Sequence, residues 1–159
     1  MAQRPQFDMS KMSTASKILL GAGLLYLIDM FLAWNKFCLA GQCSSGISGW
    51  HGIGFLNGII VILIVLMEIL LIAGVQVNAG TTQQKMMTEA GLAGALLVFT
   101  ILRVLLKPSV LGFKADIKYG AWIGLILALV IAYGGYMRWQ ESKVGTPPPA
   151  SPAGGGFAP

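Results

Sequence analysis

The chain has 159 residues, of which 55% are hydrophobic and only 11% are charged. Its mean hydropathy is +0.73, and soluble domains carry about 25% charged residues, so the composition excludes a soluble globular domain and predicts a membrane protein. The net charge of +5 comes from basic residues scattered among helix ends and short loops. Such residues anchor membrane spans at the interface, and we therefore expect no nucleic-acid partner.

Apolar runs of about 20 residues match the hydrocarbon core of a bilayer, which is about 30 Å thick, because an α-helix rises about 1.5 Å per residue. The sequence contains four such runs, and we place the predicted spans at residues 17–35, 52–76, 88–106 and 119–139. The predicted fold class is therefore all-α, a membrane-embedded bundle of four transmembrane helices in a single domain, residues 17–139. Residues 1–16 are predicted to form a short cytoplasmic segment.

The first predicted span could be mistaken for a cleaved signal peptide, because Lys11 and Lys17 precede its apolar run. The run is long for a signal core and no small-x-small cleavage site follows it, so we expect the span to be retained.

Asp29 lies inside the first predicted span and Arg103 inside the third. Placing a charged side chain near the bilayer centre costs at least about 2.5 to 3.5 kcal/mol, so each of these residues needs an ion-pair partner or access to water. Both fall about 6 to 7 Å below the outer interface, and we expect them to form an ion pair.

The following loop, "CLAGQCSSGISGWHG", holds both cysteines and the only histidine. Three interpretations compete: a structural disulfide between Cys38 and Cys43, thiol redox chemistry at the same pair, and a metal site that adds His51. The C-x4-C spacing without a relay pair of cysteines disfavours redox chemistry, and no further ligand at helical spacing completes a metal site. We favour the disulfide and expect no metal and no cofactor. Trp50 and His51 then either anchor the second helix or present a surface to a partner.

Glu68 falls short of the inner boundary of the second predicted span. Its predicted ion-pair partner is Lys17, at the inner end of the first span, and snorkelling of the carboxylate to the interface is the alternative. Intramembrane acids often mark proton or ion paths. The sequence pattern places no chain of polar residues between Glu68 and Asp29, which favours structural pairing over transport.

Small residues at every fourth position allow transmembrane helices to approach closely. The fourth span carries the longest such stripe, the second span a shorter one, and Gly91 with Ala95 repeats the pattern in the third. This pattern predicts packing inside the bundle, although one stripe could equally form a dimer. The predicted helix-packing residues are Gly120, Gly124, Ala128, Ala132, Gly54 and Gly58.

Residues 140–159, "QESKVGTPPPASPAGGGFAP", contain dense proline and glycine without apolar periodicity. Such a segment cannot bury enough apolar surface to offset its ordering entropy, so we predict a disordered tail.

Four spans place both termini on one side of the membrane. We predict a multi-pass protein of the bacterial cytoplasmic membrane with both termini cytoplasmic, because this arrangement puts more Lys and Arg inside than outside and the cysteines on the oxidising side.

Several motifs resemble a family of small four-helix integral membrane proteins of actinobacteria whose activity is uncharacterised. They are "LLYLIDMFLAW" with Asp29 and Trp34, two cysteines in the next loop, "SGWHGIGFLNG", and "YGAWIGLILALVIAYGGYMRW". The resemblance covers most of residues 17–141 and implies the topology, not a mechanism. Met67 departs from the aromatic residue expected before Glu68.

No nucleotide-binding loop and no Ser, His and Asp set is evident in the sequence, so we expect no enzymatic activity. The leading hypothesis is a small structural or accessory membrane protein, a subunit or scaffold. Its expected partners are the lipid bilayer and another membrane protein or a second copy of itself. One alternative is a transporter or proton-linked channel component that uses Asp29, Glu68 and Arg103, and the other is thiol–disulfide chemistry at Cys38 and Cys43.

Overall fold

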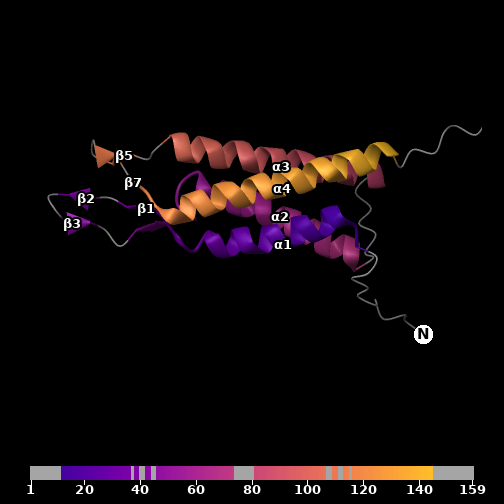
Figure 1. Ribbon diagram of the computed structural model, residues 1–159, viewed down its shortest axis with the longest axis horizontal. Helices are drawn as coiled ribbons and strands as arrows, with labels where there is room; N and C mark the ends of the chain where they lie inside the picture. The colour runs from indigo at the N-terminus through magenta and orange to yellow at the C-terminus, as the bar shows by residue number, and fades with distance from the viewer. Residues whose placement is uncertain are drawn as a thin grey trace, which may run out of the picture.

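Four helices lie side by side, and short strands gather at one end of them (Figure 1). The helices are α1 (Thr14–Asp29), α2 (Gly54–Ile72), α3 (Thr82–Leu105) and α4 (Tyr119–Val144). The start of α1 and the end of α4 lie together at the end opposite the strands, which we call the terminus end (Figure 1). The computed structural model describes residues 12–36, 38–39, 42–43, 46–73, 81–106, 109–110, 113–114 and 116–144.

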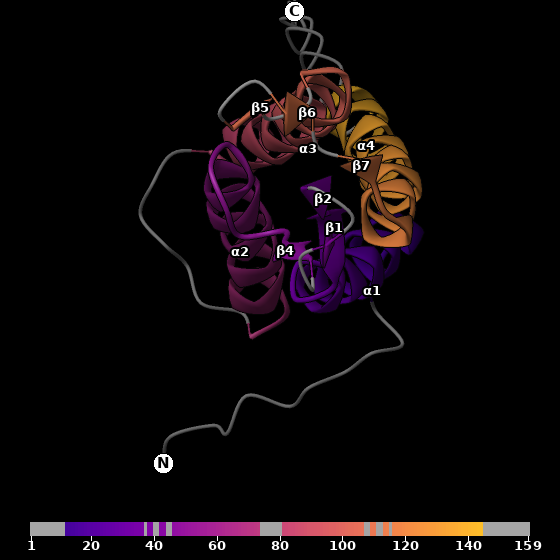
Figure 2. The same ribbon diagram turned by 90° about the vertical axis from the view of Figure 1, so that its left-hand side faces the viewer.

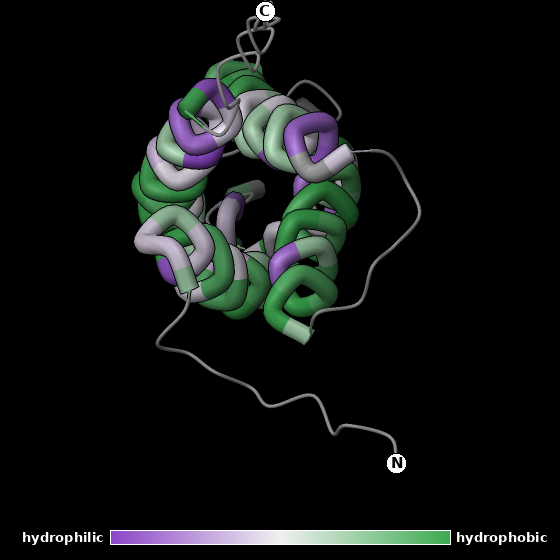
Figure 3. The backbone as a smooth tube through the Cα atoms, turned by 90° about the vertical axis from the view of Figure 1, so that its right-hand side faces the viewer, coloured by the Kyte–Doolittle hydropathy of each residue, from purple (hydrophilic) through white to green (hydrophobic). Residues whose placement is uncertain are grey.

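The helices form a ring in chain order, in which each helix packs against its two neighbours, so that α4 closes the ring against α1 (Figure 2). One cluster of buried apolar side chains fills the interior. Its largest fully buried members are Trp34, Tyr26, Leu19, Met30, Ile64, Leu96 and Ile131. Figure 3 shows largely hydrophobic helices with hydrophilic segments at the terminus end, which faces the viewer there.

Large apolar side chains are also exposed on the outside of every helix, where a soluble protein rarely keeps a contiguous apolar surface. Examples are Leu25 on α1, Phe55 on α2, Val98 on α3 and Ile126 on α4. Among the residues that the structure describes, three helices are long and apolar enough to cross a membrane: α2, the Gln83–Leu105 part of α3, and α4. The prediction of a membrane protein is therefore supported by three helices, whereas α1, with 16 residues, extends only about 24 Å.

The strands correct the all-α prediction. After α1 ends, the chain enters β1 (Ala33–Lys36), which pairs antiparallel with β4 (Ile47–Ser48) and with β7 (Asp116–Ile117) in a three-stranded sheet of order β4-β1-β7. The first predicted span, residues 17–35, was therefore placed too far along the chain. The apolar run continues past Asp29, but its last part forms a strand, because the loops at this end need partners for their backbone N–H and C=O groups.

Two further short hairpins project from the strand end of the bundle. The first joins β2 (Cys38–Leu39) to β3 (Gln42–Cys43), and the second joins β5 (Ser109–Val110) to β6 (Phe113–Lys114). The backbone N–H of Lys118 donates to the carbonyl oxygen of Trp34 at 2.8 Å, which ties the start of α4 to β1.

The other predicted boundaries also shift. The third helix begins at Thr82 rather than at residue 88, because Thr81 and Gln84 form a capping box at its start. The fourth helix continues through residue 139 to Val144 and so includes the first part of the predicted tail. Residues 1–11 and 145–159, which hold most of the predicted terminal segments, lie outside the described residues, as do residues 74–76 at the end of the second predicted span and residues 77–80 after it.

The small-residue stripe of α4 faces the end of α1 and β1, as the sequence predicts for a packing face. A Cβ atom at Gly120 would lie 2.8 Å from the carbonyl oxygen of Ala33, and Gly124 lies directly against the ring of Trp34. Ala128 is fully buried and Ala132 is half-buried. This stripe allows the tryptophan of β1 to enter the mouth of the bundle.

The other predicted stripes have different roles. Gly54 leaves room for the guanidinium of Arg103, and Gly58 leaves room for the ring of Trp50, so these glycines accommodate side chains rather than a close helix backbone. A Cβ atom at Gly91 would meet nothing within 4 Å, so this glycine does not mark a close helix contact.

The close approach at Gly124 gives a testable prediction. In Gly124→Ala, the new Cβ would overlap the Trp34 ring and approach Oδ2 of Asp29 to 2.8 Å, and overpacking of this kind costs about 1 to 3 kcal/mol. We expect a lower melting temperature for the detergent-solubilised full chain. Gly91→Ala is the matched control and should not lower it, so equal melting temperatures for the two variants would contradict the packing described here.

Candidate functional site

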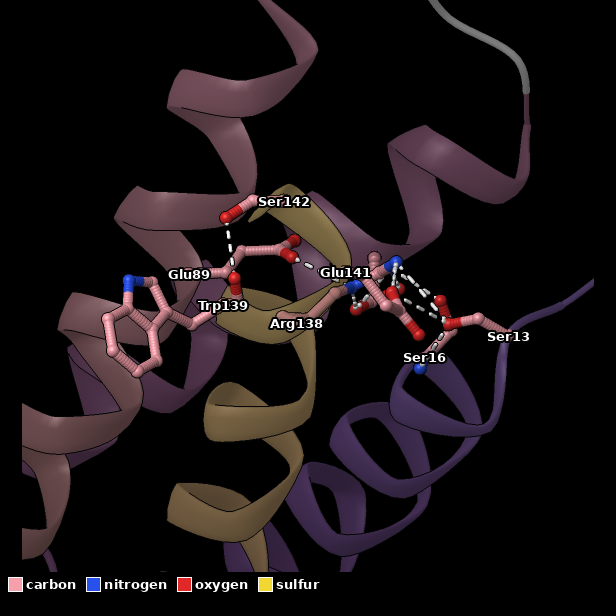
Figure 4. Close-up of polar contacts among 8 residues, drawn as sticks. Ser13, Ser16, Glu89, Arg138, Trp139, Glu141 and Ser142 are labelled. Atoms are coloured by element: carbon pink, nitrogen blue, oxygen red, sulfur yellow. Dashed lines mark hydrogen bonds and ion pairs between the residues drawn. The ribbon is translucent and has the colours of Figure 1, made fainter. Parts of the chain in front are cut away.

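The most extensive polar contacts of the described residues surround Arg138 at the terminus end of the bundle (Figure 4). Arg138 lies on α4, is 6% exposed, and forms an ion pair with Glu68 of α2, in which Nη2 lies 2.9 Å from Oε1 and 3.0 Å from Oε2. Its Nε also donates to Oε1 of Glu68 at 3.3 Å. Because the Glu68 side chain is fully buried, this pair is isolated from solvent on the α2 side.

The same guanidinium also binds hydroxyl groups of α1. Nη1 of Arg138 donates to Oγ of Ser13 at 3.4 Å, and Nη2 donates to Oγ of Ser16. Ser13 is the N-cap of α1, where its side chain accepts a hydrogen bond from the backbone N–H of Ser16 at 3.2 Å. Arg138 therefore connects the first turn of α1 to α2 across the interior of the bundle.

Two more glutamates complete this group, which we call the terminus-end cluster: Ser13, Ser16, Glu68, Glu89, Arg138 and Glu141. Glu89 of α3 is fully buried, and its Oε2 lies 3.3 Å from Nε of Arg138. Glu141, one turn after Arg138 on α4, accepts from Nη1 at 3.1 Å and is 33% exposed. The cluster thus brings together residues of all four helices.

A second polar group lies nearer the strands and connects three helices. The hydroxyl of Thr100 donates to the carbonyl oxygen of Leu96 at 2.8 Å, so Tyr26 is the donor in the 2.9 Å bond between their hydroxyl groups. Nδ2 of Asn57 donates to both hydroxyl oxygens at 3.2 Å. The result is a closed triangle of side chains from α1, α2 and α3.

Above this triangle, Trp34 fills the mouth of the bundle between two buried charges. Its Nε1 donates to the backbone carbonyl oxygen of Asp29 at 3.0 Å, and the guanidinium carbon of Arg103 lies 4.6 Å from the centre of a Trp34 ring. Arg103 also donates to the carbonyl oxygens of Gly49 and Ser48, in the turn that precedes α2. Trp34, Asp29, Arg103 and the triangle form what we call the strand-end cluster.

Both predicted ion pairs are wrong. Arg103 is satisfied by two carbonyl oxygens and an aromatic face, and the carboxylate oxygens of Asp29 have no hydrogen-bond partner in the described part of the chain. Glu68 pairs with Arg138, and Lys17 is exposed. Both pairs were predicted from depth alone, and depth does not determine which way a side chain points around the helix axis.

The two cysteines form a disulfide, Cys38–Cys43, which closes the β2–β3 hairpin.

His51 is exposed, and its Nδ1 lies 3.2 Å from Oγ of Ser48. The ring of Trp50 packs against Gly58 and lies 5.7 Å from the ring of Phe31. Of the two residues considered as a partner surface, His51 remains accessible, whereas Trp50 is half-buried against its own bundle. Within the described ranges, no group of three His, Cys, Asp or Glu residues could hold a metal ion.

Glu89 was not predicted as a site residue, and Arg138 was expected to lie at the membrane interface. A signal for both was present, because Glu89, Ala93, Leu96, Thr100 and Arg103 recur at helical spacing on α3 and are all buried. Gly124, Ala128, Ile131, Gly135 and Arg138 do the same on α4. Residues at such spacing share one face of a helix, so extending each stripe would have placed both charges inside the bundle.

Searches of protein families, of curated proteins and of solved structures find no match to this chain. The resemblance to small actinobacterial membrane proteins therefore stays a prediction.

Removing the Arg138 guanidinium should destabilise the bundle strongly. In Arg138→Met, Glu68 and Glu89 remain fully buried without the cation, and breaking a buried pair in this way costs about 3 to 5 kcal/mol. We expect a large drop in the melting temperature of the detergent-solubilised protein. Lys17→Met is the control, because Lys17 is exposed, and an effect of similar size there would contradict the assigned pairing.

The disulfide also gives a direct prediction. A bulky maleimide should label neither Cys38 nor Cys43 in the purified protein until a reductant is added, and a variant with both cysteines changed to Ser should stay unlabelled throughout. Closing so short a ring contributes about 2 kcal/mol in the chain-entropy model, so reduction should lower the melting temperature only modestly. Labelling without a reductant would show that the thiols are free.

Proposed function

We propose that this protein is a small non-enzymatic integral membrane protein that acts as a structural or accessory subunit. The observation that carries the proposal is the apolar layer between the two polar clusters. On α1, Ser16 and Tyr26 are separated by about 15 Å of helix, and the side chains at the level between them are apolar and fully buried. They include Leu19, Ile64, Leu96, Val61 and Ile131.

This layer argues against a continuous polar path along the bundle. The hydrogen bonds and ion contacts of each cluster are made mainly within that cluster, and each cluster joins different helices to one another. Such an interior is suited to holding a fixed shape, which is what a scaffold or accessory subunit requires. The exposed apolar surface would then face lipid or another membrane protein.

We further propose that α1 is the fourth span and that both termini are cytoplasmic, in a bacterial cell membrane. Extended residues of β1 add about 3.3 Å each to the length of α1, and non-helical backbone is tolerated at membrane depth where protein covers it. Trp34 and Asn35 of β1 are buried. The disulfide at the strand end supports placing that end on the oxidising side.

Affinity purification of the full chain from its native membrane in mild detergent, with crosslinking before extraction, tests the accessory role. We expect one integral membrane protein, or a second copy of this chain, to be crosslinked and to co-purify in a constant ratio. The same tag on an unrelated multi-pass protein is the control. A product that is monomeric and uncrosslinked under these conditions would contradict the proposal.

A proton-linked channel or transporter component is the second candidate, and one observation favours it. Asp29 is 2% exposed, and neither of its carboxylate oxygens has a hydrogen-bond partner in the described structure. Buried carboxyl groups of this kind occur in proton relays of membrane proteins. Asp29 is separated from Glu68 by the apolar layer, so a path would require water to enter that layer.

A flux assay in sealed vesicles distinguishes these candidates. Vesicles that contain the wild-type chain, Asp29→Asn or Glu68→Gln should show the same slow proton leak as empty vesicles, because the apolar layer blocks a water-filled path. The measurement is the decay of an imposed pH gradient, reported by an enclosed dye. Faster decay in the wild type that either variant abolishes would favour the transport function over the accessory one.

A further inference from the structure

The guanidinium of Arg138 uses all of its hydrogen-bond donors. An arginine carries five N–H donors. Nε–H donates to Glu68, and the two Nη2–H groups serve Glu68 and Ser16. The two Nη1–H groups serve Ser13 and Glu141. All five donors are therefore used by residues of α1, α2 and α4.

Glu89 thus receives no hydrogen bond from Arg138, although it is close to the guanidinium. Its Oε2 lies 3.3 Å from Nε of Arg138, but the N–H bond at that nitrogen is directed at Glu68, and neither oxygen of Glu89 accepts a hydrogen bond from the residues that the structure describes. Glu89 is fully buried on the inner stripe of α3. An ionised carboxylate in such surroundings is very costly unless it is paired and hydrogen-bonded.

The charge balance leads to the same conclusion. Glu68 alone neutralises Arg138, and Glu141 adds another carboxylate at the partly exposed edge of the cluster. Lys85 lies one turn before Glu89 on the same helix and is half-buried. On α1, the residues that face the cluster are the neutral Ser13 and Ser16. Within the interior, a charged Glu89 would be a second carboxylate facing a single cation.

We propose that Glu89 is a proton-binding site, in which the carboxyl group carries a proton while Arg138 is bound to Glu68. Loss of that proton to water leaves a carboxylate that competes with Glu68 for the guanidinium. Nε of Arg138 lies 3.3 Å from an oxygen of each of the two acids, Oε1 of Glu68 and Oε2 of Glu89, so a small rotation of the guanidinium would exchange its partner. The protonation state of Glu89 would thereby set whether α4 is held to α2 or to α3.

The site lies close to water at the terminus end. Glu141, which accepts a hydrogen bond from Nη1 of Arg138 at 3.1 Å, is 33% exposed, so water at the helix ends borders the cluster. Proton binding from one end requires no path through the apolar layer. Proton binding at Glu89 therefore depends neither on the accessory role nor on the transport alternative.

Infrared spectroscopy of the full chain in lipid nanodiscs, with ¹³C-labelled glutamate, tests the proposal. A protonated carboxylic acid has its own C=O stretching band, and the label separates glutamate from Asp29. We expect the wild type to show a labelled band at neutral pH that disappears at alkaline pH. Glu89→Gln should lack the band, and Glu141→Gln should keep it.

Glu68→Gln provides the sharper test. Without the Glu68 carboxylate, the donors of Arg138 are free to bind Glu89, which should then ionise, so the band should be lost at neutral pH although Glu89 is still present. A labelled band that persists in Glu89→Gln, or no labelled band in the wild type at neutral pH, would overturn the proposal.

Thermal denaturation gives a readout that does not depend on spectral assignment. If native Glu89 holds a proton that the unfolded chain releases, the melting temperature of the wild type should fall as pH rises from the ordinary pKa of glutamate, about 4.3, to the pH at which the band disappears, and should level off above it. Glu89→Gln, which has no proton to take up, should lack that fall and should be at least as stable as the wild type at neutral pH. A large loss of stability in Glu89→Gln at neutral pH would show instead that a charged carboxylate is needed there.

Discussion

The contact of Arg138 with two buried glutamates is the interaction on which the rest of the bundle depends. One guanidinium reaches α1 through its hydroxyl groups, α2 through Glu68 and α3 through Glu89, while belonging to α4 itself. A buried charge without its partner is strongly destabilising. The four helices must therefore be together before these groups leave water, which makes their association at the terminus end mutually dependent.

At the opposite end, an aromatic side chain has the organising role. Trp34 enters the mouth of the bundle from β1, where Gly120 and Gly124 leave room for it and Arg103 lies over its ring. This explains why α1 stops short although its sequence stays apolar: a continued helix would carry Trp34 out of the mouth. The short sheet satisfies backbone groups that the broken helix would otherwise expose, as is required for irregular backbone near a membrane.

The sequence sufficed to predict the four helices, the paired cysteines and the packing face of α4. Each follows from a local property: apolar length, cysteine spacing and a run of small residues. The partners of the buried charges were not predictable by the same means. Lys17 and Arg138 lie at about the same depth, and only the direction of each side chain around its helix selects Arg138. The strand β1 was missed because Ala33 and Trp34 continue the apolar run of α1 without a break. The other strands are two residues long, which is too short to leave an alternating pattern in the sequence.

The distribution of polar groups along the bundle has a physical reason. Lipid tails solvate any apolar helix face about as well as another helix does, so apolar packing alone discriminates weakly between helix pairings in a membrane. Directional contacts discriminate better, because a misplaced helix leaves a buried donor or charge unsatisfied. The Tyr26, Asn57 and Thr100 triangle fixes three helices near the strands, and Arg138 fixes all four at the other end. Because these two sets of polar contacts lie at opposite ends of the bundle, they determine both the order of the helices and the axial position of each helix. The apolar layer between them does not have to select one helix pairing over another.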